Sequence, residues 1–316
     1  MTAQARERPA FGGTLGAALL AAALFAVATI YPQLGLLAIT APFPLILSRL
    51  RSGLGGGLTS SLLAVALLGA LLTPGQAVAF GLFLGVPALL IGEAMDRGRG
   101  LRRGCTWGFV YLAFLIGGAL LLDGAEMAAR VLEPLDQYRS PESIAEMKKT
   151  GLAPERIEDV AEQFASLRNA LAVVYPAAYI IMGALVVLAN ATLLRIYLAR
   201  RDPGLLEDGE FERTRLPLGL AVVFVLAGLG VLLDALRPAA YNVLLVLAFF
   251  FALQGLAVVA YYVHRLAAPS FLRLAVLVLV LVNPWAKETL ALLGLFDIWL
   301  DFRKYAEAPE DPPRGA

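Results

Sequence analysis

Long apolar runs separated by short polar connections dominate the chain. A bilayer core about 30 Å thick needs about 20 apolar residues of helix to cross it, so runs of this length predict membrane-spanning helices. Eight such runs are present: 14–31, 33–48, 54–72, 76–93, 107–122, 171–198, 216–234 and 239–263. The pattern predicts an all-α, polytopic transmembrane helix bundle.

A ninth apolar stretch, 271–300, carries an interruption at Asn283-Pro284-Trp285. Proline removes a backbone donor and disfavours helix in the residue before it. The stretch is therefore either one long kinked helix or two short half-helices that form a hairpin or re-entrant element. Because both readings remain open, we expect eight to ten spans, and the side of the C-terminus is undecided.

One sizeable polar segment, 123–170, interrupts the apolar runs and predicts a helical insertion outside the membrane. Ser140-Pro141 is typical of a helix start, Gly151 of a helix end, and a second helix is expected from Pro154 into the sixth span. Apolar residues of this second helix recur at spacings of three and four, namely Ile157, Val160, Ala161, Phe164 and Leu167. This amphipathic face can pack on the protein itself, cover a ligand site or dock a partner.

These segments divide the chain into five parts. A tail at 1–13 precedes five spans at 14–122, the insertion occupies 123–170, three further spans and the broken final element fill 171–300, and a polar tail follows at 301–316.

The distribution of basic residues predicts the orientation, because cytoplasmic connections carry an excess of lysine and arginine. Alternate connections are rich in arginine, namely those with Arg6, Arg8, Arg49, Arg51, Arg97, Arg99, Arg102, Arg103, Arg195, Arg200, Arg201, Arg213, Arg215, Arg265 and Arg273. We therefore expect a cytoplasmic N-terminus, with the first run kept as an anchor rather than cleaved as a signal peptide. A hairpin at the end would make Arg303 and Lys304 cytoplasmic as well.

Composition agrees with a membrane protein: 59% of residues are hydrophobic, 16% are charged, and the mean hydropathy is +0.74. Soluble domains are typically about 25% charged. The 26 lysines and arginines against 25 acidic residues leave a net charge of +1, which excludes a nucleic-acid binder. The single cysteine, Cys105, cannot form an intrachain disulfide.

The motifs of catalysis and of nucleotide binding are missing from the sequence. There is no G-x-x-x-x-G-K-[ST] loop to hold phosphates, and Gly53-Leu54-Gly55-Gly56-Gly57, which lacks a following lysine, indicates close helix packing. His264 is the one histidine, which excludes a histidine-based metal site. We therefore predict no catalytic residue, no metal site and no cofactor.

Polar groups near membrane depth are costly and are candidates for a functional site. Several lie toward the predicted outer ends of spans, and broken helices with inward polar groups are how membrane proteins build small-molecule sites. The predicted ligand-binding residues are Gln33, Asp123, Tyr175, Asn242, Asn283, Trp285 and Lys287. The alternatives are hydrogen bonds between helices and, for the aromatic residues, anchoring at the membrane interface.

The C-terminal segment Gly294-Leu295-Phe296-Asp297-Ile298-Trp299-Leu300-Asp301-Phe302-Arg303-Lys304 resembles the LGL-D-x-x-x-DFR ending of the YybS-like family, bacterial membrane proteins of unassigned function. That family is distantly similar to the substrate-binding S components of energy-coupling-factor vitamin transporters. The resemblance implies a bacterial cytoplasmic (inner) membrane and a small-xxx-small face on the first helix that docks on a coupling subunit. The matching positions are Ala17, Ala18, Ala21 and Ala22.

Three functions follow from these observations. The first is a non-enzymatic subunit that binds a small solute and is energised by a separate ATPase and coupling subunit. The second is a membrane scaffold without a solute. The third is an intramembrane enzyme acting on lipid, with Asp123, Glu126 and Lys287 as its polar centre.

Overall fold

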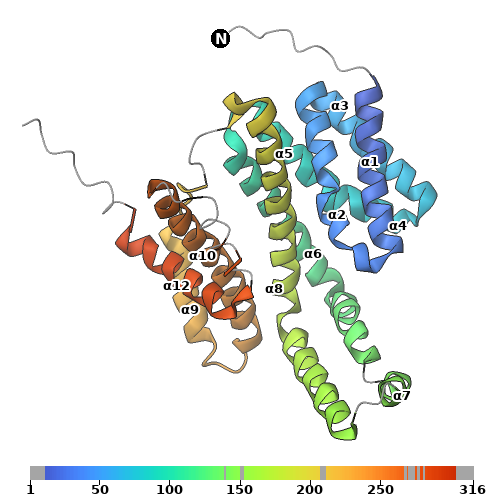
Figure 1. The fold of residues 1–316 in the computed structure, drawn as a ribbon, viewed down its shortest axis with the longest axis vertical. Coiled ribbons are helices and arrows are strands. Elements are labelled where there is room, and N and C mark those ends of the chain that lie inside the picture. Colours follow the sequence, from blue (N-terminus) through green and yellow to red (C-terminus); the bar gives the residue numbers. More distant parts are fainter. Residues whose placement is uncertain are drawn as a thin grey trace, which may run out of the picture. The chain divides into compact units, whose positions relative to one another are not determined.

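A computed structural model describes residues 11–138, 140–149, 153–206, 211–266 and 282–303, together with 269, 275, 278 and 279. Every regular element within these residues is helical, which confirms the predicted all-α fold (Figure 1). The chain forms two compact units. Unit 1 comprises Met1–Leu122 and Tyr179–Asp208, and unit 2 comprises Asp123–Ala178 and Gly209–Ala316.

Six helical runs in the described residues are long and apolar enough to cross a membrane. They are Gly13–Ile30, Leu36–Leu71, Pro74–Asp96, Gly100–Lys149, Glu155–Arg201 and Arg237–Arg265. The number is lower than the eight predicted spans for two reasons. The run Leu36–Leu71 contains two predicted spans, and the predicted span 216–234 forms only the 13-residue helix α9 (Leu218–Gly230).

In unit 1, α1 (Phe11–Ile30) is followed by η1 (Pro32–Leu34), α2 (Leu36–Thr40) and α3 (Pro42–Leu71), and α1 packs along α3. Within α3, Gly53 has φ +71° and ψ −170°, a conformation that is not helical. The Ser48 hydroxyl donates to the Gly56 carbonyl at 3.2 Å, although eight residues of straight helix would separate them by about 12 Å. The chain therefore reverses at Gly53, which separates the predicted spans 33–48 and 54–72.

The rest of unit 1 comes from three long segments. Thr73 and Gln76 form a capping box at the start of α4 (Pro74–Phe80), which continues through a π-helical turn, η2 (Gly81–Gly85), into α5 (Val86–Asp96). The first part of α6 (Gly100–Gln137) and the last part of α8 (Pro154–Arg201) complete the unit, and η3 (Pro203–Leu205) follows. The core is small and apolar, with Leu45, Phe80 and Leu194 almost fully buried.

In unit 2, the insertion forms as predicted wherever it is described. Ser140 caps α7 (Pro141–Lys149) by accepting from the Ser143 amide at 3.2 Å, and α8 begins at Pro154. Gly151 lies outside the described residues. The second helix packs back on α6, because Phe164 stacks on Tyr138 with ring centroids 4.5 Å apart and Ile157 is 5% exposed. This contact supports the first of the three readings of the amphipathic face.

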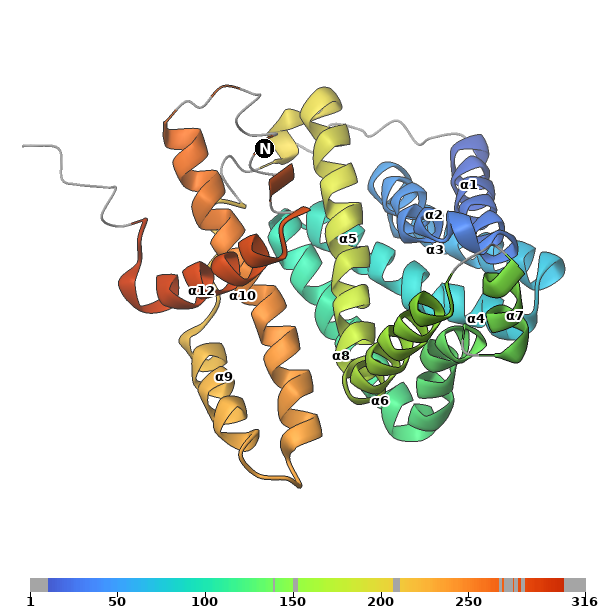
Figure 2. The same cartoon turned by 60° about the horizontal axis from the view of Figure 1, so that its bottom comes forward.

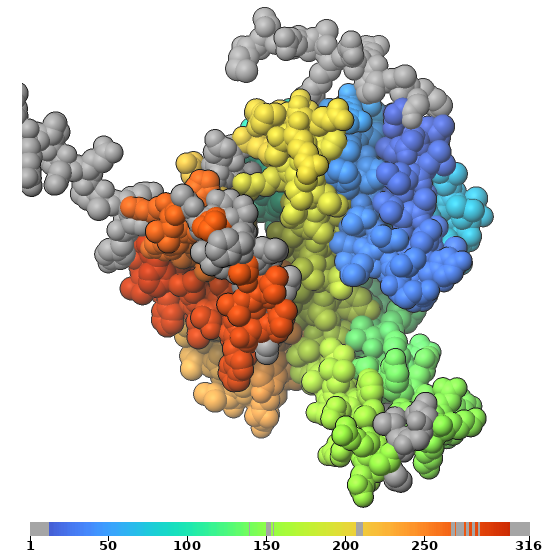
Figure 3. Space-filling model, in the orientation of Figure 1, coloured from blue at the N-terminus to red at the C-terminus, as the bar shows by residue number. Residues whose placement is uncertain are grey.

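Among the described residues, unit 2 also contains α9, α10 (Arg237–Arg265) and α12 (Pro284–Leu300). Figure 2 shows α12 crossing α10 steeply, while α9 runs beside α10. At the crossing, a Cβ added to Gly255 would lie 2.0 Å from the Leu290 carbonyl oxygen, and one added to Gly294 would lie 1.9 Å from that of Phe251. The two backbones thus touch, which only glycine permits. In the space-filling view the side chains of α12 cover part of α10 (Figure 3).

Candidate functional site

The predicted interruption at Asn283-Pro284-Trp285 is the start of α12. Asn283 has an extended backbone (φ −96°, ψ 115°), and its side-chain oxygen accepts a hydrogen bond from the Trp285 amide at 3.0 Å. Asparagine in this position satisfies a helix-start donor, and proline at the first helical position needs none. The chain therefore breaks its helix here, while most of the preceding residues, 270–281, lie outside the described part.

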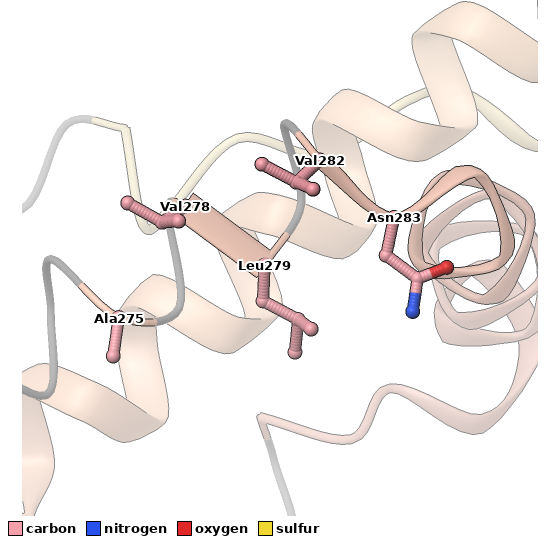
Figure 4. Close-up of a pocket in the computed structure, with 5 residues that line it drawn as sticks. All are labelled: Ala275, Val278, Leu279, Val282 and Asn283. Carbon is pink, nitrogen blue, oxygen red and sulfur yellow. The ribbon is translucent and has the colours of Figure 1, made fainter.

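A shallow hollow of about 590 Å³, wide open on one side, adjoins this break. It is lined by Ala275, Val278, Leu279, Val282 and Asn283. Figure 4 shows the side chains of Leu279 and Asn283 pointing to the same side, with the amide nitrogen of Asn283 at the tip. Since the amide oxygen is used by the helix cap, the Asn283 NH₂ group is what the side chain offers to the hollow.

The structure brings only Asn283 of the predicted residues to this hollow. Trp285 is 73% exposed and Lys287 is also exposed, and neither lines the hollow. Gln33 is exposed in η1 and belongs to unit 1, whereas the other six predicted ligand-binding residues belong to unit 2. The seven residues therefore do not form one described site.

Asn242 repairs a proline break in α8. Pro176 lies inside that helix and has no backbone N–H. The side chain of Asn242 accepts from the Ala177 amide at 2.8 Å and donates to the Val173 carbonyl at 2.7 Å. These two groups are four residues apart and would bond each other in a regular helix. The Asn242 amide thus inserts between these two groups and links α10 to α8. Hydrogen bonding between helices was the alternative to ligand binding in the sequence analysis.

Asp123 and Tyr175 meet at a second irregularity. Asp123 leaves the helical conformation of α6 with φ −144° and ψ 34°. The Tyr175 hydroxyl lies 3.3 Å from the position that a Cβ on Gly124 would occupy, so the ring packs on this kink. Asp123 is hydrogen-bonded to Glu126, which also accepts from Arg130. The two carboxyl groups are therefore neighbours on one exposed helix face.

A buried polar centre, formed by Gln254, Asp297 and Arg303, was missed by the sequence reading. The side chains of Asp297 and Arg303 are 1% and 4% exposed and pair at 2.5 Å. Gln254 donates to the same Asp297 oxygen at 2.9 Å and accepts from the Leu216 amide at 2.8 Å. Buried charges in a membrane protein must be paired, and here the carboxylate has three donors because the Phe302 amide adds a contact at 3.2 Å.

This buried polar centre joins distant parts of unit 2. Arg303 donates to the carbonyls of Glu212 at 2.6 Å and Thr214 at 3.0 Å, so the end of α12 is attached to the connection before α9. The Tyr262 hydroxyl donates to the Phe302 carbonyl at 2.7 Å, which places the end of α12 beside the end of α10. The C-terminal ends of α10 and α12 thus lie side by side, which favours a hairpin or re-entrant element over a single crossing.

The signal for this centre lay in the C-terminal segment itself. Asp297 and Arg303 were named for the family resemblance, and Gln254 is a polar residue inside an apolar run. Asp297 and Arg303 are six positions apart, but Gln254 meets them because α12 crosses α10 at the glycine contact. The 43 positions between Gln254 and Asp297 hid this contact in the sequence.

The predicted docking face on the first helix is occupied by the protein itself. Ala18 and Ala21 are fully buried and Ala22 is 2% exposed, all within the core that α1 forms with α3, while Ala17 is half-buried. The small residues let two backbones of one chain approach closely. The three buried alanines are thus in contact with the protein's own core, and the docking of a coupling subunit on this face stays a prediction.

Metal-binding groups are not assembled in the described part of the chain, where no three His, Cys, Asp or Glu side chains cluster. Cys105 is half-buried and forms no disulfide.

Comparison with known proteins gives a family without a described activity. The chain matches a family model described as "Predicted membrane protein (DUF2232)" over residues 19–298. No curated protein and no solved structure matches it. The match extends over most of the chain. The six long apolar helices imply contact with the lipid bilayer. The protein therefore belongs to the DUF2232 family of predicted membrane proteins.

Proposed function

We propose that this protein is an integral membrane subunit that binds a small solute in the hollow beside Asn283. The observation that carries the proposal is the coincidence of a hollow of about 590 Å³ with a broken helix start. Small-molecule sites typically enclose about 300–1,000 Å³, with apolar walls and a few polar groups. Broken helices at such sites supply polar groups where the surrounding backbone lines a cavity.

The lining indicates which solutes fit. Four of the five lining residues are aliphatic, so the body of the solute is apolar. The free donor of Asn283 is its NH₂ group, because its oxygen caps α12. A solute with an apolar body and a hydrogen-bond acceptor, such as a carbonyl or carboxylate, matches both features.

The rest of the proposal concerns energy and location. Because the sequence lacks a phosphate-binding loop, the energy for moving a solute would come from a separate ATPase and coupling subunit. This is the arrangement of the S components, to which the YybS-like family that the C-terminal segment resembles is distantly similar. The arginine distribution supports an N-terminus in the cytoplasm, and the YybS-like resemblance of the C-terminal segment supports a bacterial inner membrane.

Native mass spectrometry of the gently purified protein tests solute binding. Asn283→Ser keeps an oxygen that can cap α12 but removes the amide donor. Leu279→Trp fills the hollow, and Leu292→Trp is the matched control because Leu292 is 55% exposed on α12 and does not line the hollow.

We expect a co-purified small molecule on the wild type and on Leu292→Trp, and its loss from Asn283→Ser and Leu279→Trp. Retention of the molecule by both hollow variants would refute the site. Lipid or another membrane protein, with no small molecule on any variant, would favour the scaffold function.

A further inference from the structure

Exposed arginines gather at one end of unit 1. They come from the turn of α3, the end of α5, the start of α6 and the end of α8, namely Arg51, Arg97, Arg99, Arg103, Arg200 and Arg201. Two contacts show that these elements meet: Arg49 pairs with Asp96 at 3.2 Å, and Arg51 lies 5.5 Å from the ring centroid of Tyr197. Figure 1 shows the turn of α3 and the end of α5 at the same end of this unit.

Two of the carboxylates at this end, those of Glu93 and Asp96, are paired with a buried arginine, and Glu93 also pairs with Arg97, while Asp202 is exposed. Arg49 is 3% exposed, and its guanidinium bridges Glu93 and Asp96 on α5. Glycines make room for it, since Cβ atoms added to Gly57 and Gly92 would lie 2.9 Å and 2.5 Å from its side-chain carbons. The carboxylates are thus largely neutralised from within, and the surface keeps a positive excess.

Two aromatic residues set the depth of the arginines. Arg99 lies 5.1 Å from the ring centroid of Trp107, and Arg51 lies over Tyr197 and donates to its hydroxyl. Trp107 and Tyr197 are at the ends of the apolar segments of α6 and α8. Tryptophan and tyrosine at such positions sit at headgroup level. The guanidinium groups beside them therefore lie at the level of the lipid phosphates.

We propose that this arginine surface binds the headgroups of anionic phospholipids. Arginine presents a planar fork of donors that matches phosphate oxygens bidentately, and clustered basic residues at a membrane surface attract anionic lipids. The aromatic residues favour a lipid headgroup as the ligand, because they place the guanidinium groups at the depth of the lipid phosphates. Binding of a free phosphate would not depend on this depth.

The test is native mass spectrometry of the detergent-solubilised protein titrated with phosphatidylglycerol or with phosphatidylcholine. The variant Arg103→Gln/Arg200→Gln/Arg201→Gln removes three charges from the arginine surface. The matched control, Lys148→Gln/Lys149→Gln/Arg156→Gln, removes three exposed charges from the insertion. Six exposed substitutions of this kind leave the packed helices untouched.

We expect the wild type and the control to prefer phosphatidylglycerol. The arginine variant should lose on the order of 100-fold in affinity for it, since each basic residue near an anionic surface contributes roughly fivefold. An unchanged preference in the arginine variant, or an equal loss in the control, would overturn the proposal. If millimolar glycerol phosphate displaced bound phosphatidylglycerol as effectively as added phosphatidylglycerol does, the surface would be a site for free phosphate instead.

Discussion

Two buried arginines, one in each unit, hold their surroundings together in different ways. In unit 1, Arg49 bridges two carboxylates of one helix, and Glu93 and Asp96 remain 20% and 27% exposed. In unit 2, Arg303 pairs with one carboxylate, Asp297, that is 1% exposed, and binds two loop carbonyls.

The two arginine–carboxylate pairings differ in how far water reaches the carboxylates. Water still reaches the partners of Arg49, and Glu93 also pairs with Arg97, so its carboxylates keep other stabilising contacts. Asp297 is almost fully buried and has three protein donors: Phe302 and Arg303 follow it in the chain, and the crossing of α10 and α12 brings Gln254 to it. The buried polar centre in unit 2 is therefore an all-or-none assembly, whereas the pairing in unit 1 can weaken gradually.

The largest effect is expected from Arg303→Leu. It leaves the Asp297 carboxylate buried without a cationic partner, which typically costs about 3–5 kcal/mol. Arg49→Leu should cost less, about 1–3 kcal/mol, because its partners are partly hydrated. Unfolding of the purified protein in detergent, followed by helical circular dichroism, measures both. Equal losses would show that the two pairings do not differ as described.

The glycine crossing is the next test of unit 2. Gly255→Ala places a Cβ 2.0 Å from a backbone oxygen that cannot rotate away, so we expect a loss of about 1–3 kcal/mol as α12 separates from α10. Gly228→Ala on α9 is the matched control, because no atom lies within 4 Å of its Cβ position. Alanine there should be neutral or should stabilise the helix by about 0.5–1 kcal/mol. The same unfolding measurement compares them, and similar losses in both would contradict the close crossing.

The Asn242 contact can be tested by a double-mutant cycle. Asn242→Leu should cost about 1–3 kcal/mol, because it leaves the Val173 carbonyl and the Ala177 amide unpaired. In a Pro176→Ala background these groups can bond each other, so the same substitution should cost much less. An identical cost in the two backgrounds would mean that Asn242 does not repair the proline break.

The reversal at Gly53 is the corresponding test within unit 1. Gly53→Ala forces a side chain into a conformation with φ +71° and should cost about 1–3 kcal/mol, while Gly55→Ala, which has open space and an ordinary φ, should cost little. Thermal unfolding in detergent distinguishes them. Tolerance of alanine at both positions would argue for a continuous α3.

Elements that depend on local chemistry could be predicted from the sequence. Apolar length predicted the helical segments, the Asn283-Pro284 pair predicted the break before α12, and Ser140 and Pro154 marked helix starts in the insertion. The glycine run beginning at Gly53 indicated close packing. It did not indicate that the chain reverses at Gly53, where φ is positive.

Contacts between distant segments could not be predicted. Nothing in the apolar pattern indicates that Asn242 meets Pro176 or that Arg303 meets the carbonyl of Glu212, which is 91 positions away. A polar residue in a span has the same sequence signature whether it binds a solute, a backbone group or another side chain. For that reason the predicted set of seven ligand-binding residues included Asn242, which completes a helix, and omitted Gln254 and Asp297.

Because the C-terminal ends of α10 and α12 are in contact, the residues before and after the last apolar segment should face the same side of the membrane. Single cysteines in a Cys105→Ala background, labelled with a membrane-impermeant thiol reagent in oriented vesicles, test it directly. Pro269→Cys precedes the segment and Pro309→Cys follows it, while Gly204→Cys and Glu142→Cys report the two predicted sides of the membrane. We predict that positions 269 and 309 react from the same side as position 204. Labelling of position 309 from the side of position 142, with position 269 on the other side, would mean that the last apolar segment crosses the membrane once, and would contradict a hairpin or re-entrant element.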